Sequence, residues 1–246
     1  MPEDWFDSTV ATTYDDDESE MFDPAAIGAT VDVLERLAGS GPALEFAIGT
    51  GRVALPLASR GVQVSGIELS TAMLRQLRAK AGGGEAAIPV VVGDMATVRT
   101  PRCGTFTLTY LVFNTITNLT AQEEQVACFQ NAALHLAPGG YFVIETFVPR
   151  LRMLPPGERF VPYAVTEDFI GIDEYDVAHQ RLTCHYVQTR ETLERSSMPF
   201  RYVWPSELDL MAQLAGLEKR ERWADWSGAP FTSESESHVS VWQKSL

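Results

Sequence analysis

The sequence predicts an α/β protein: a doubly wound, mostly parallel seven-stranded sheet with an antiparallel β insertion after the fifth strand. Short apolar runs alternate with helical patterns between residues 23 and 147, which is typical of a parallel sheet covered on both faces. After residue 148 the pattern changes to short runs in which every second residue is apolar, and this predicts antiparallel strands. A last helix and two more strands then complete the first sheet.

The first predicted helix begins at Pro24, because Asp23 can cap it and proline is favoured at the first helical position. Gly39 ends that helix, and Ser70 is the expected cap of the third helix. The elements predicted in this part are helix 24–38, strand 43–48, helix 52–59, strand 63–69, helix 71–80, strand 88–92, strand 106–113, helix 121–136 and strand 141–147.

The second part of the chain begins with a linker rich in proline, residues 149–157. Pro205 starts the last helix and Gly216 ends it. The strands predicted around that helix are 160–166, 181–190, 193–203, 217–226 and 238–244. We therefore expect four regions: an acidic N-terminal arm or flap (1–22), a cofactor-binding core (23–148), a lid insertion (149–204), and a last helix with edge strands that completes the core sheet (205–246).

The bulk composition excludes several classes of partner. The chain has 246 residues, enough for one domain with an insertion, and a formal net charge of −14. Because lysine and arginine form no cluster, nucleic acid and anionic membranes are poor partners, whereas a small cationic ligand suits the charge. No apolar run is long enough to span a membrane, and the acidic N-terminus is not a signal peptide. The three cysteines lie far apart without metal spacing, so we expect a cytoplasmic protein.

Residues 1–22 are polar and acidic, and two interpretations of them remain open. The segment is either a mobile, solvated arm or a flap that becomes ordered over a ligand. In the second case Trp5 and Tyr14 are its apolar contacts. The run of acids at 15–18 is not a convincing metal site, because adjacent carboxylates point in different directions.

The stretch from Ala43 to Ser70 reads strand, turn, helix and strand, and the second strand ends on the acid Glu68. The turn contains Gly49 and Gly51 in the spacing of a dinucleotide-binding loop. Glycine lets a ligand approach the backbone, and a carboxylate at the neighbouring strand end can bind a ribose diol. NAD and S-adenosylmethionine both fit, and a ligand-free structural turn is the third interpretation.

Four further features favour S-adenosylmethionine over NAD. Glu45 lies four residues before Gly49, where an acid attracts an amino group and a sulfonium but repels a diphosphate. Asp94 follows the third strand and can accept a hydrogen bond from adenine, with Met95 packed on the ring. A ProGlyGly turn at 138–140 leads into the fifth strand, and a whole helix precedes the first strand.

Together these motifs resemble those of the class I S-adenosylmethionine-dependent methyltransferases, which have a Rossmann-like fold. The family's acid-x-Gly-x-Gly-x-Gly motif maps to residues 45–51, with Ala47 in place of the first glycine. The resemblance covers roughly residues 23–246 and implies S-adenosylmethionine as cofactor and methyl transfer to N or O of a small metabolite. The β insertion is similar to that of amino-sugar N,N-dimethyltransferases and glycine N-methyltransferase, where it covers the acceptor. The residues expected at the cofactor are Tyr14, Glu45, Ala47, Gly49, Gly51, Glu68, Leu69, Asp94 and Met95.

The acceptor is expected at the ends of the fourth and fifth strands. Asn114 and Asn118 can orient it, although asparagine also caps loops and helices. Glu145 can take a proton or hold an ammonium group, with a salt bridge as the alternative. His185, on a lid strand, is a candidate base or a partly buried structural histidine. The strand-four end lacks the acid of magnesium-dependent catechol enzymes, so we predict no catalytic metal.

Three lid residues complete the candidate acceptor site. Arg201 and Tyr202 can clamp an anionic group, with lid packing as the alternative. Trp204 can form part of an aromatic cavity wall, with ordinary core packing as the alternative. The expected partner is a small-molecule acceptor, and the chain is expected to be a monomer or a homodimer. Two rival functions remain, an NAD-dependent oxidoreductase and a non-catalytic cofactor-binding protein. The first lacks a recognisable Tyr/Lys or His set for hydride transfer.

Overall fold

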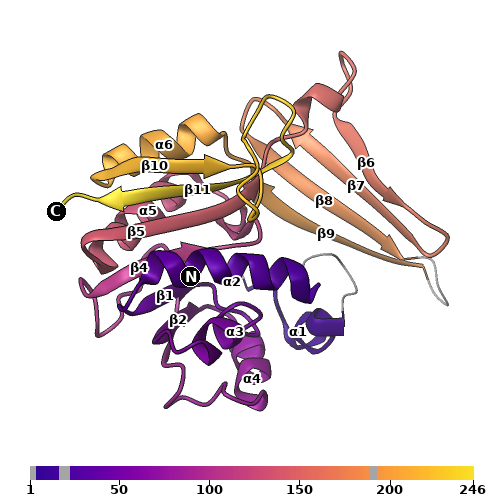
Figure 1. Cartoon of the computed structure of the whole chain (residues 1–246). Coiled ribbons are helices and arrows are strands. Elements are labelled where there is room, and N and C mark those ends of the chain that lie inside the picture. The colour runs from indigo at the N-terminus through magenta and orange to yellow at the C-terminus, as the bar shows by residue number, and fades with distance from the viewer. Residues whose placement is uncertain (1–3, 17–22, 189–192) are drawn as a thin grey trace.

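The computed structural model describes residues 4–16, 23–188 and 193–246, and within them it confirms the predicted fold class (Figure 1). The main sheet has the strand order β10-β11-β5-β4-β1-β2-β3. Strands β1 to β5 are parallel, and β11 runs antiparallel between β5 and β10. The strands are β1 (Ala43–Phe46), β2 (Val64–Glu68), β3 (Val90–Val92), β4 (Phe106–Leu111), β5 (Leu136–Phe147), β10 (Leu217–Trp223) and β11 (Ser237–Lys244).

Helices cover both faces of this sheet. One face packs against Leu34 of α2 (Pro24–Ala38), Leu57 of α3 (Ala54–Ser59) and Leu77 of α4 (Thr71–Ala79). The other face packs against Phe129 of α5 (Gln122–His135) and Leu208 of α6 (Pro205–Leu214). Each such buried side chain contributes about 1.5–3 kcal/mol through the hydrophobic effect. In the described part of the chain, no helix is both long and apolar enough to cross a membrane.

The predicted helix starts are confirmed by their capping contacts. Asp23 Oδ1 accepts a hydrogen bond of 3.0 Å from the Ala25 N–H, and Pro24 opens α2. Ser70 Oγ accepts the Met73 N–H at 3.4 Å, which caps α4 directly after β2. The cap fixes the point at which the chain turns from β2 into α4, next to the pocket described below.

The antiparallel insertion is a separate four-stranded sheet that projects from one end of the main sheet (Figure 1). It consists of β6 (Phe160–Val165), β7 (Phe169–Asp176), β8 (Arg181–Gln188) and β9 (Glu194–Arg201). The strand β7 was not predicted. Gly171 and Asp173 occupy buried positions of β7, where a half-buried strand ordinarily carries apolar residues, so its alternating pattern is weak. Residues 189–190, at the end of one predicted strand, lie outside the described residues.

Strand β5 begins at Leu136 rather than at the predicted Tyr141. The ProGlyGly turn lies inside it and interrupts the pairing with β4: Phe106 pairs with Leu136, whereas Leu108 pairs with Tyr141. The turn predicted before the fifth strand is therefore present as an irregularity within a longer strand.

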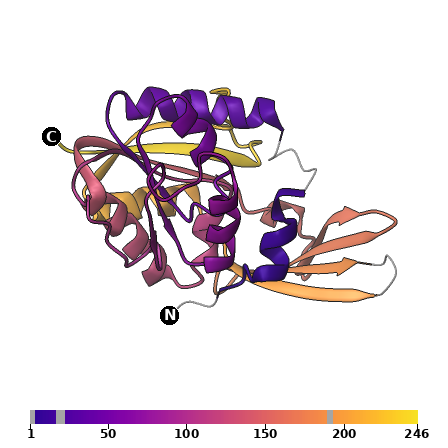
Figure 2. The same ribbon diagram turned by 90° about the horizontal axis from the view of Figure 1, so that it is seen from below.

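The described part of the N-terminal region forms α1 (Ser8–Thr13) and the 3-10 turn η1 (Tyr14–Asp16). Helix α1 lies beside α4, on the side from which the four-stranded sheet projects (Figures 1 and 2). Ala11 packs against Ala72 and Met73 of α4. Residues 1–3 and 17–22 of the predicted arm lie outside the described residues.

Candidate cofactor-binding site

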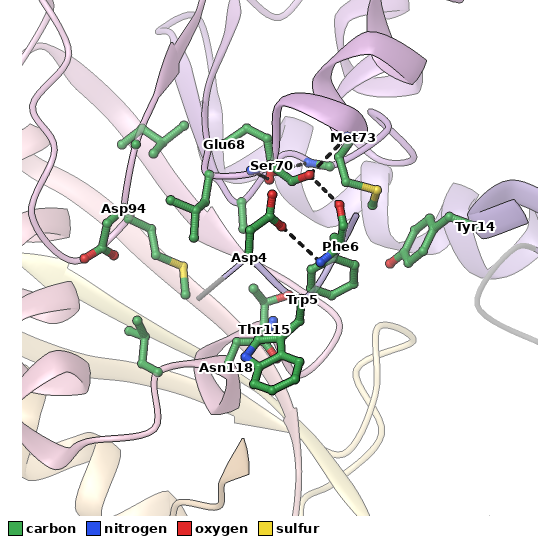
Figure 3. A pocket seen from close by; sticks show the side chains of 17 residues that line it. Asp4, Trp5, Phe6, Tyr14, Glu68, Ser70, Met73, Asp94, Thr115 and Asn118 are labelled. Atoms are coloured by element: carbon green, nitrogen blue, oxygen red, sulfur yellow. Dashed lines mark hydrogen bonds between the residues drawn. The ribbon is translucent and has the colours of Figure 1, made fainter. Parts of the chain in front are cut away.

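A pocket lies where the strand order reverses, at the carboxyl ends of β1 and β2 and beside β4. Ligands of open α/β sheets bind at this position, because the loops that follow neighbouring strands diverge there. Figure 3 shows the residues that line the pocket. The predicted site residues among them are Tyr14, Ala47, Gly49, Glu68, Leu69, Asp94, Met95 and Asn118.

The turn between β1 and α3 supplies one wall of the pocket. Three of its residues have left-handed backbone conformations, with φ of 51° at Ala47, 57° at Gly49 and 81° at Gly51. A Cβ at Gly51 would lie 2.4 Å from Cδ1 of Leu77, so glycine is required there for packing against α4 as well as for conformation. Ala47 keeps a Cβ in a conformation that favours glycine, which places local strain directly at the pocket.

Glu68 ends β2 and its carboxylate is held by two backbone donors. Its Oε2 accepts the Gly49 N–H at 2.7 Å and its Oε1 accepts the Ser70 N–H at 2.8 Å. Burial raises the pKa of this carboxyl; the two N–H groups act against that shift, and the nearby Asp4 adds to it. A carboxylate has about four acceptor sites, so the oriented group can still accept a ribose hydroxyl.

Glu45 is buried below the turn and does not line the pocket. Its Oε2 accepts the hydroxyl of Tyr110 at 2.9 Å. Burial raises the pKa of Glu45 to about 8, although the Tyr110 hydrogen bond and the charge of Arg52 act in the opposite direction. Glu45 therefore lies under the turn that contains Gly49, and a contact with the cofactor stays a prediction.

Asp94 and Met95 follow β3 on the opposite side of the pocket. Asp94 Oδ1 accepts the Ala96 N–H at 2.8 Å, which closes a tight turn and fixes the carboxylate. Met95 is buried apart from its face toward the pocket. The pair thus lies at the pocket, where the resemblance places the adenine ring.

The N-terminal region supplies the remaining wall, through Asp4, Trp5, Phe6 and Tyr14 (Figure 3). Ser70 Oγ donates a hydrogen bond of 2.5 Å to the Phe6 carbonyl, and the rings of Phe6 and Tyr14 meet edge to face at 6.2 Å. Of these residues the sequence singled out Trp5 and Tyr14 as contacts of a flap. A further sequence signal for this wall is Phe6, a second aromatic residue directly after Trp5 in an otherwise acidic stretch.

Asn114 and Glu145 lie together just beyond the pocket. Glu145 Oε2 accepts the Phe113 N–H at 2.9 Å, and Asn114 Oδ1 accepts the Phe147 N–H at 2.8 Å. Both side chains are therefore used to join the end of β4 to the end of β5. The following turn η3 (Thr115–Asn118) does line the pocket.

His185 lies in β8 of the insertion and does not line the pocket. Its Nε2 is 3.0 Å from Glu174 Oε2, and its Nδ1 is 2.8 Å from Ser197 Oγ. Both ring nitrogens are thus engaged within the four-stranded sheet. A role as base stays a prediction that requires the insertion to approach the pocket.

Arg201 is buried and is bonded inside the protein. Its guanidinium pairs with Glu207 at 2.7 Å and donates to Gln125 at 2.5 Å and to Gln180 at 3.2 Å. An anionic acceptor would have to compete with Glu207 for this cation.

Tyr202 and Trp204 follow Arg201 in the connection to α6. Tyr202 is buried, with its ring 5.7 Å from that of Tyr175 and 6.4 Å from that of Trp204. Trp204 is partly exposed, and neither ring lines the pocket. Across the described residues, no group of three or more His, Cys, Asp or Glu side chains is placed to hold a metal ion.

Comparison with known proteins relates the chain to enzymes that transfer methyl groups. Residues 43–140 match the family described as "Methyltransferase domain". The chain is 27% identical over 243 residues to the cypemycin N-terminal methyltransferase of a Streptomyces species, covering 97% of each chain. The CcbJ methyltransferase from Streptomyces caelestis is 32% identical, with a TM-score of 0.84 and 96% of each chain covered. CalS10, an amino pentose methyltransferase from Micromonospora echinaspora solved with S-adenosylmethionine bound, has a TM-score of 0.67 at 18% identity, covering 97% of this chain and 98% of that one.

Proposed function

Since this chain belongs to the S-adenosylmethionine-dependent methyltransferases, we propose that it methylates an amine nitrogen of a small-molecule acceptor. The observation on which the proposal rests is the cofactor-sized pocket in which the carboxylate of Glu68 is oriented beside the glycine turn. Bound S-adenosylmethionine supplies a methyl group on a positively charged sulfur, and the reaction is a direct displacement.

Within the pocket, we assign one part of the cofactor to each wall. Glu68 accepts the ribose hydroxyls, since its carboxylate is fixed by Gly49 and Ser70. The turn from Ala47 to Gly51 receives the methionine end, because Gly49 and Gly51 carry no side chain that would block the approach to the backbone. Asp94 and Met95 receive the adenine. These residues hold the cofactor in one position, and positioning alone can lower the barrier by about 7–11 kcal/mol.

An amine acceptor is supported by charge and by the names of the relatives. The chain carries a net charge of −14, which favours the approach of a cationic molecule. One relative is named as the cypemycin N-terminal methyltransferase, and a fold neighbour as an amino pentose methyltransferase. Asn118 at the pocket and the nearby Glu145 are polar groups that can orient the amine, whose lone pair must be free to attack. His185 is the further candidate base.

The remaining features are proposed as follows. The insertion (149–204) forms a wall over the acceptor, with Arg201, Tyr202 and Trp204 at its base. The protein is a monomer or a homodimer of the cytoplasm, and the free thiols of Cys103, Cys128 and Cys184 suit a reducing compartment.

The test is a methyl-transfer assay with paired acceptors. The purified chain is incubated with S-adenosylmethionine and a panel of amines, including an amino sugar and a peptide with a free N-terminus, each beside its hydroxyl analogue. We expect S-adenosylhomocysteine release and a product heavier by one CH₂ with an amine only. Methylation of the hydroxyl analogue alone would contradict the assignment to nitrogen.

A further inference from the structure

The pocket is closed on one side by a segment that lies far from the rest of it in the sequence. We call residues 4–16 the arm. Trp5, Phe6 and Tyr14 of the arm line the pocket together with Glu68 and the glycine turn (Figure 3). A ligand that fills this pocket is therefore in contact with the arm, and its departure breaks those contacts.

The arm is attached to the core through Phe6 and through helix α1. The Phe6 carbonyl accepts the Ser70 hydroxyl at 2.5 Å, and Ala11 packs against Ala72 and Met73. Ser70 and Met73 line the pocket themselves, so changing either one would disturb the binding of the cofactor directly. Variants of this first attachment therefore cannot separate the role of the arm from that of the pocket.

A second attachment lies at the end of the arm and outside the pocket lining. Asp15 Oδ1 accepts the hydroxyl of Thr50 at 2.7 Å, and Asp15 Oδ2 pairs with Nζ of Lys80 at 2.6 Å. The Nζ of Lys80 also donates to the Thr50 carbonyl at 2.8 Å. The three residues thus join the arm, the glycine turn and the end of α4 in one closed network.

The hydrogen bond made by Thr50 is the contact of this network that contributes most to its stability. The residue is 1% exposed and lies between Gly49 and Gly51, the two glycines of the turn. Removal of the Asp15 acceptor leaves a buried hydroxyl without that partner, which is costly. The ion pair itself contributes less, since the Asp15 and Lys80 side chains are 35% and 32% exposed and are screened by solvent.

We propose that Asp15, Thr50 and Lys80 form a latch that holds the arm against the glycine turn and limits the rate at which the cofactor leaves. Asp15 and Lys80 are positioning residues, because they touch the arm and the turn but do not line the pocket. The latch couples the two sides of the site: when it is closed, Thr50 fixes the turn and Trp5 stays over the pocket. The proposal rests on the assignment of this pocket to the cofactor.

The experiment measures association and dissociation of S-adenosylhomocysteine by surface plasmon resonance on the full chain. The variants are Asp15→Ala, Asp15→Asn and Lys80→Met. We expect Asp15→Ala to raise the dissociation rate constant about tenfold with little change in association. Asp15→Asn should have a smaller effect, because its amide oxygen can still accept the Thr50 hydroxyl. The matched control is Asp32→Ala, which breaks an exposed pair with Arg60 between α2 and α3, and its rates should equal those of the wild type.

Hydrogen exchange on the same proteins shows whether the arm responds. S-adenosylhomocysteine should slow exchange of the arm amides in the wild type and in Asp32→Ala, and this protection should be lost in Asp15→Ala. Wild-type dissociation rates in both Asp15→Ala and Lys80→Met would overturn the latch. Should Asp15→Ala fail to fold, Lys80→Met decides alone. If the wild type does not bind S-adenosylhomocysteine, the assignment of the pocket to the cofactor fails, and the latch fails with it. If the wild type binds and the variants have unchanged rates, only the latch fails.

Discussion

The side chain of Glu145 accepts a hydrogen bond from the backbone N–H of Phe113 at 2.9 Å. Phe113 and the following Asn114 have φ of 56° and 60°, so two consecutive residues other than glycine lie in the left-handed region. Such residues cost on the order of 1–3 kcal/mol each and persist only where neighbouring contacts hold them. Glu145 is one of these contacts, and its backbone carbonyl, which accepts the Asn114 N–H at 3.1 Å, is another.

Substitution of Glu145 should therefore act on stability first. We expect Glu145→Leu to lower the free energy of unfolding by about 0.5–1.5 kcal/mol, because the Phe113 N–H loses its acceptor and water replaces it at this exposed position. Glu145→Gln should lose less, since its amide oxygen can accept the same N–H. Urea unfolding of the ligand-free proteins measures both. An equal loss in the two variants would show that the charge of Glu145 matters and the hydrogen bond does not.

Substitution of Glu68 should act on cofactor affinity. We expect Glu68→Ala to weaken S-adenosylhomocysteine binding by about tenfold or more, because a charge-assisted acceptor for the ribose is lost and the Gly49 and Ser70 donors lose their partner. Isothermal titration calorimetry measures this affinity. The matched control is Glu85→Ala, an exposed acid that pairs with Arg78 outside the pocket lining. Wild-type affinity in Glu68→Ala would remove Glu68 from the binding site.

The buried Glu45 should make stability depend on pH. Its pKa is about 8 in the folded protein and 4.5 without the fold, mainly because of burial, so the folded state keeps a proton that the unfolded state releases. Its contribution to stability is full below pH 4.5 and is lost as the pH rises through about 8. The slope is on the order of 1 kcal/mol per pH unit.

The check is urea unfolding of the wild type and Glu45→Gln between about pH 5 and about pH 8, without cofactor. The substituted amide would keep an acceptor for the Tyr110 hydroxyl but has no proton to lose, so the pH dependence of the variant should be shallower. Part of the slope will remain, because burial also raises the pKa of Glu68. Parallel curves for the two proteins would contradict the assignment to Glu45.

Arg201 should behave as a structural residue. Its guanidinium pairs with the partly buried Glu207 and bonds two glutamines, so Arg201→Met leaves a carboxylate without its counter-charge. We expect a loss of about 3–5 kcal/mol in the free energy of unfolding. Arg201→Lys should lose less, because it keeps the charge. A stable Arg201→Met that binds S-adenosylhomocysteine but no longer methylates an anionic acceptor would instead support the clamp predicted from sequence.

The parts of the site that sequence predicts are those whose residues lie close together along the chain. The turn with Gly49 and Gly51, the cap Ser70 and the strand-end acid Glu68 all fall within one strand-turn-helix-strand unit, where glycine spacing and capping are local signals. The resemblance of the motifs to one family then indicated which cofactor the pocket binds. This is why the pocket could be located from residues 43–95 before any contact was known.

The other parts of the site depend on contacts between segments that are distant in the sequence. Ser70 and Phe6 are separated by 64 positions, and Glu145 and Phe113 by 32, so no spacing pattern marks either pair. Arg201 is a further case: its partners in the structure include Gln125, 76 positions away, which no local pattern marks, and the ligand clamp suggested by the sequence near it stays a prediction. Long-range partners decide whether a polar side chain faces a ligand or the interior.

The place of β11 in the main sheet also sets an order for folding during synthesis. Residues 237–244 are made after both of their neighbours, β5 and β10, and Trp242 is fully buried once they are inserted. Until they leave the ribosome, β5 has an unpaired edge, and such edges attract other strands. The cofactor half, β1 to β4, can already be assembled at that stage. The newly made chain is therefore most exposed to aggregation in the interval between the emergence of β5 and that of β11.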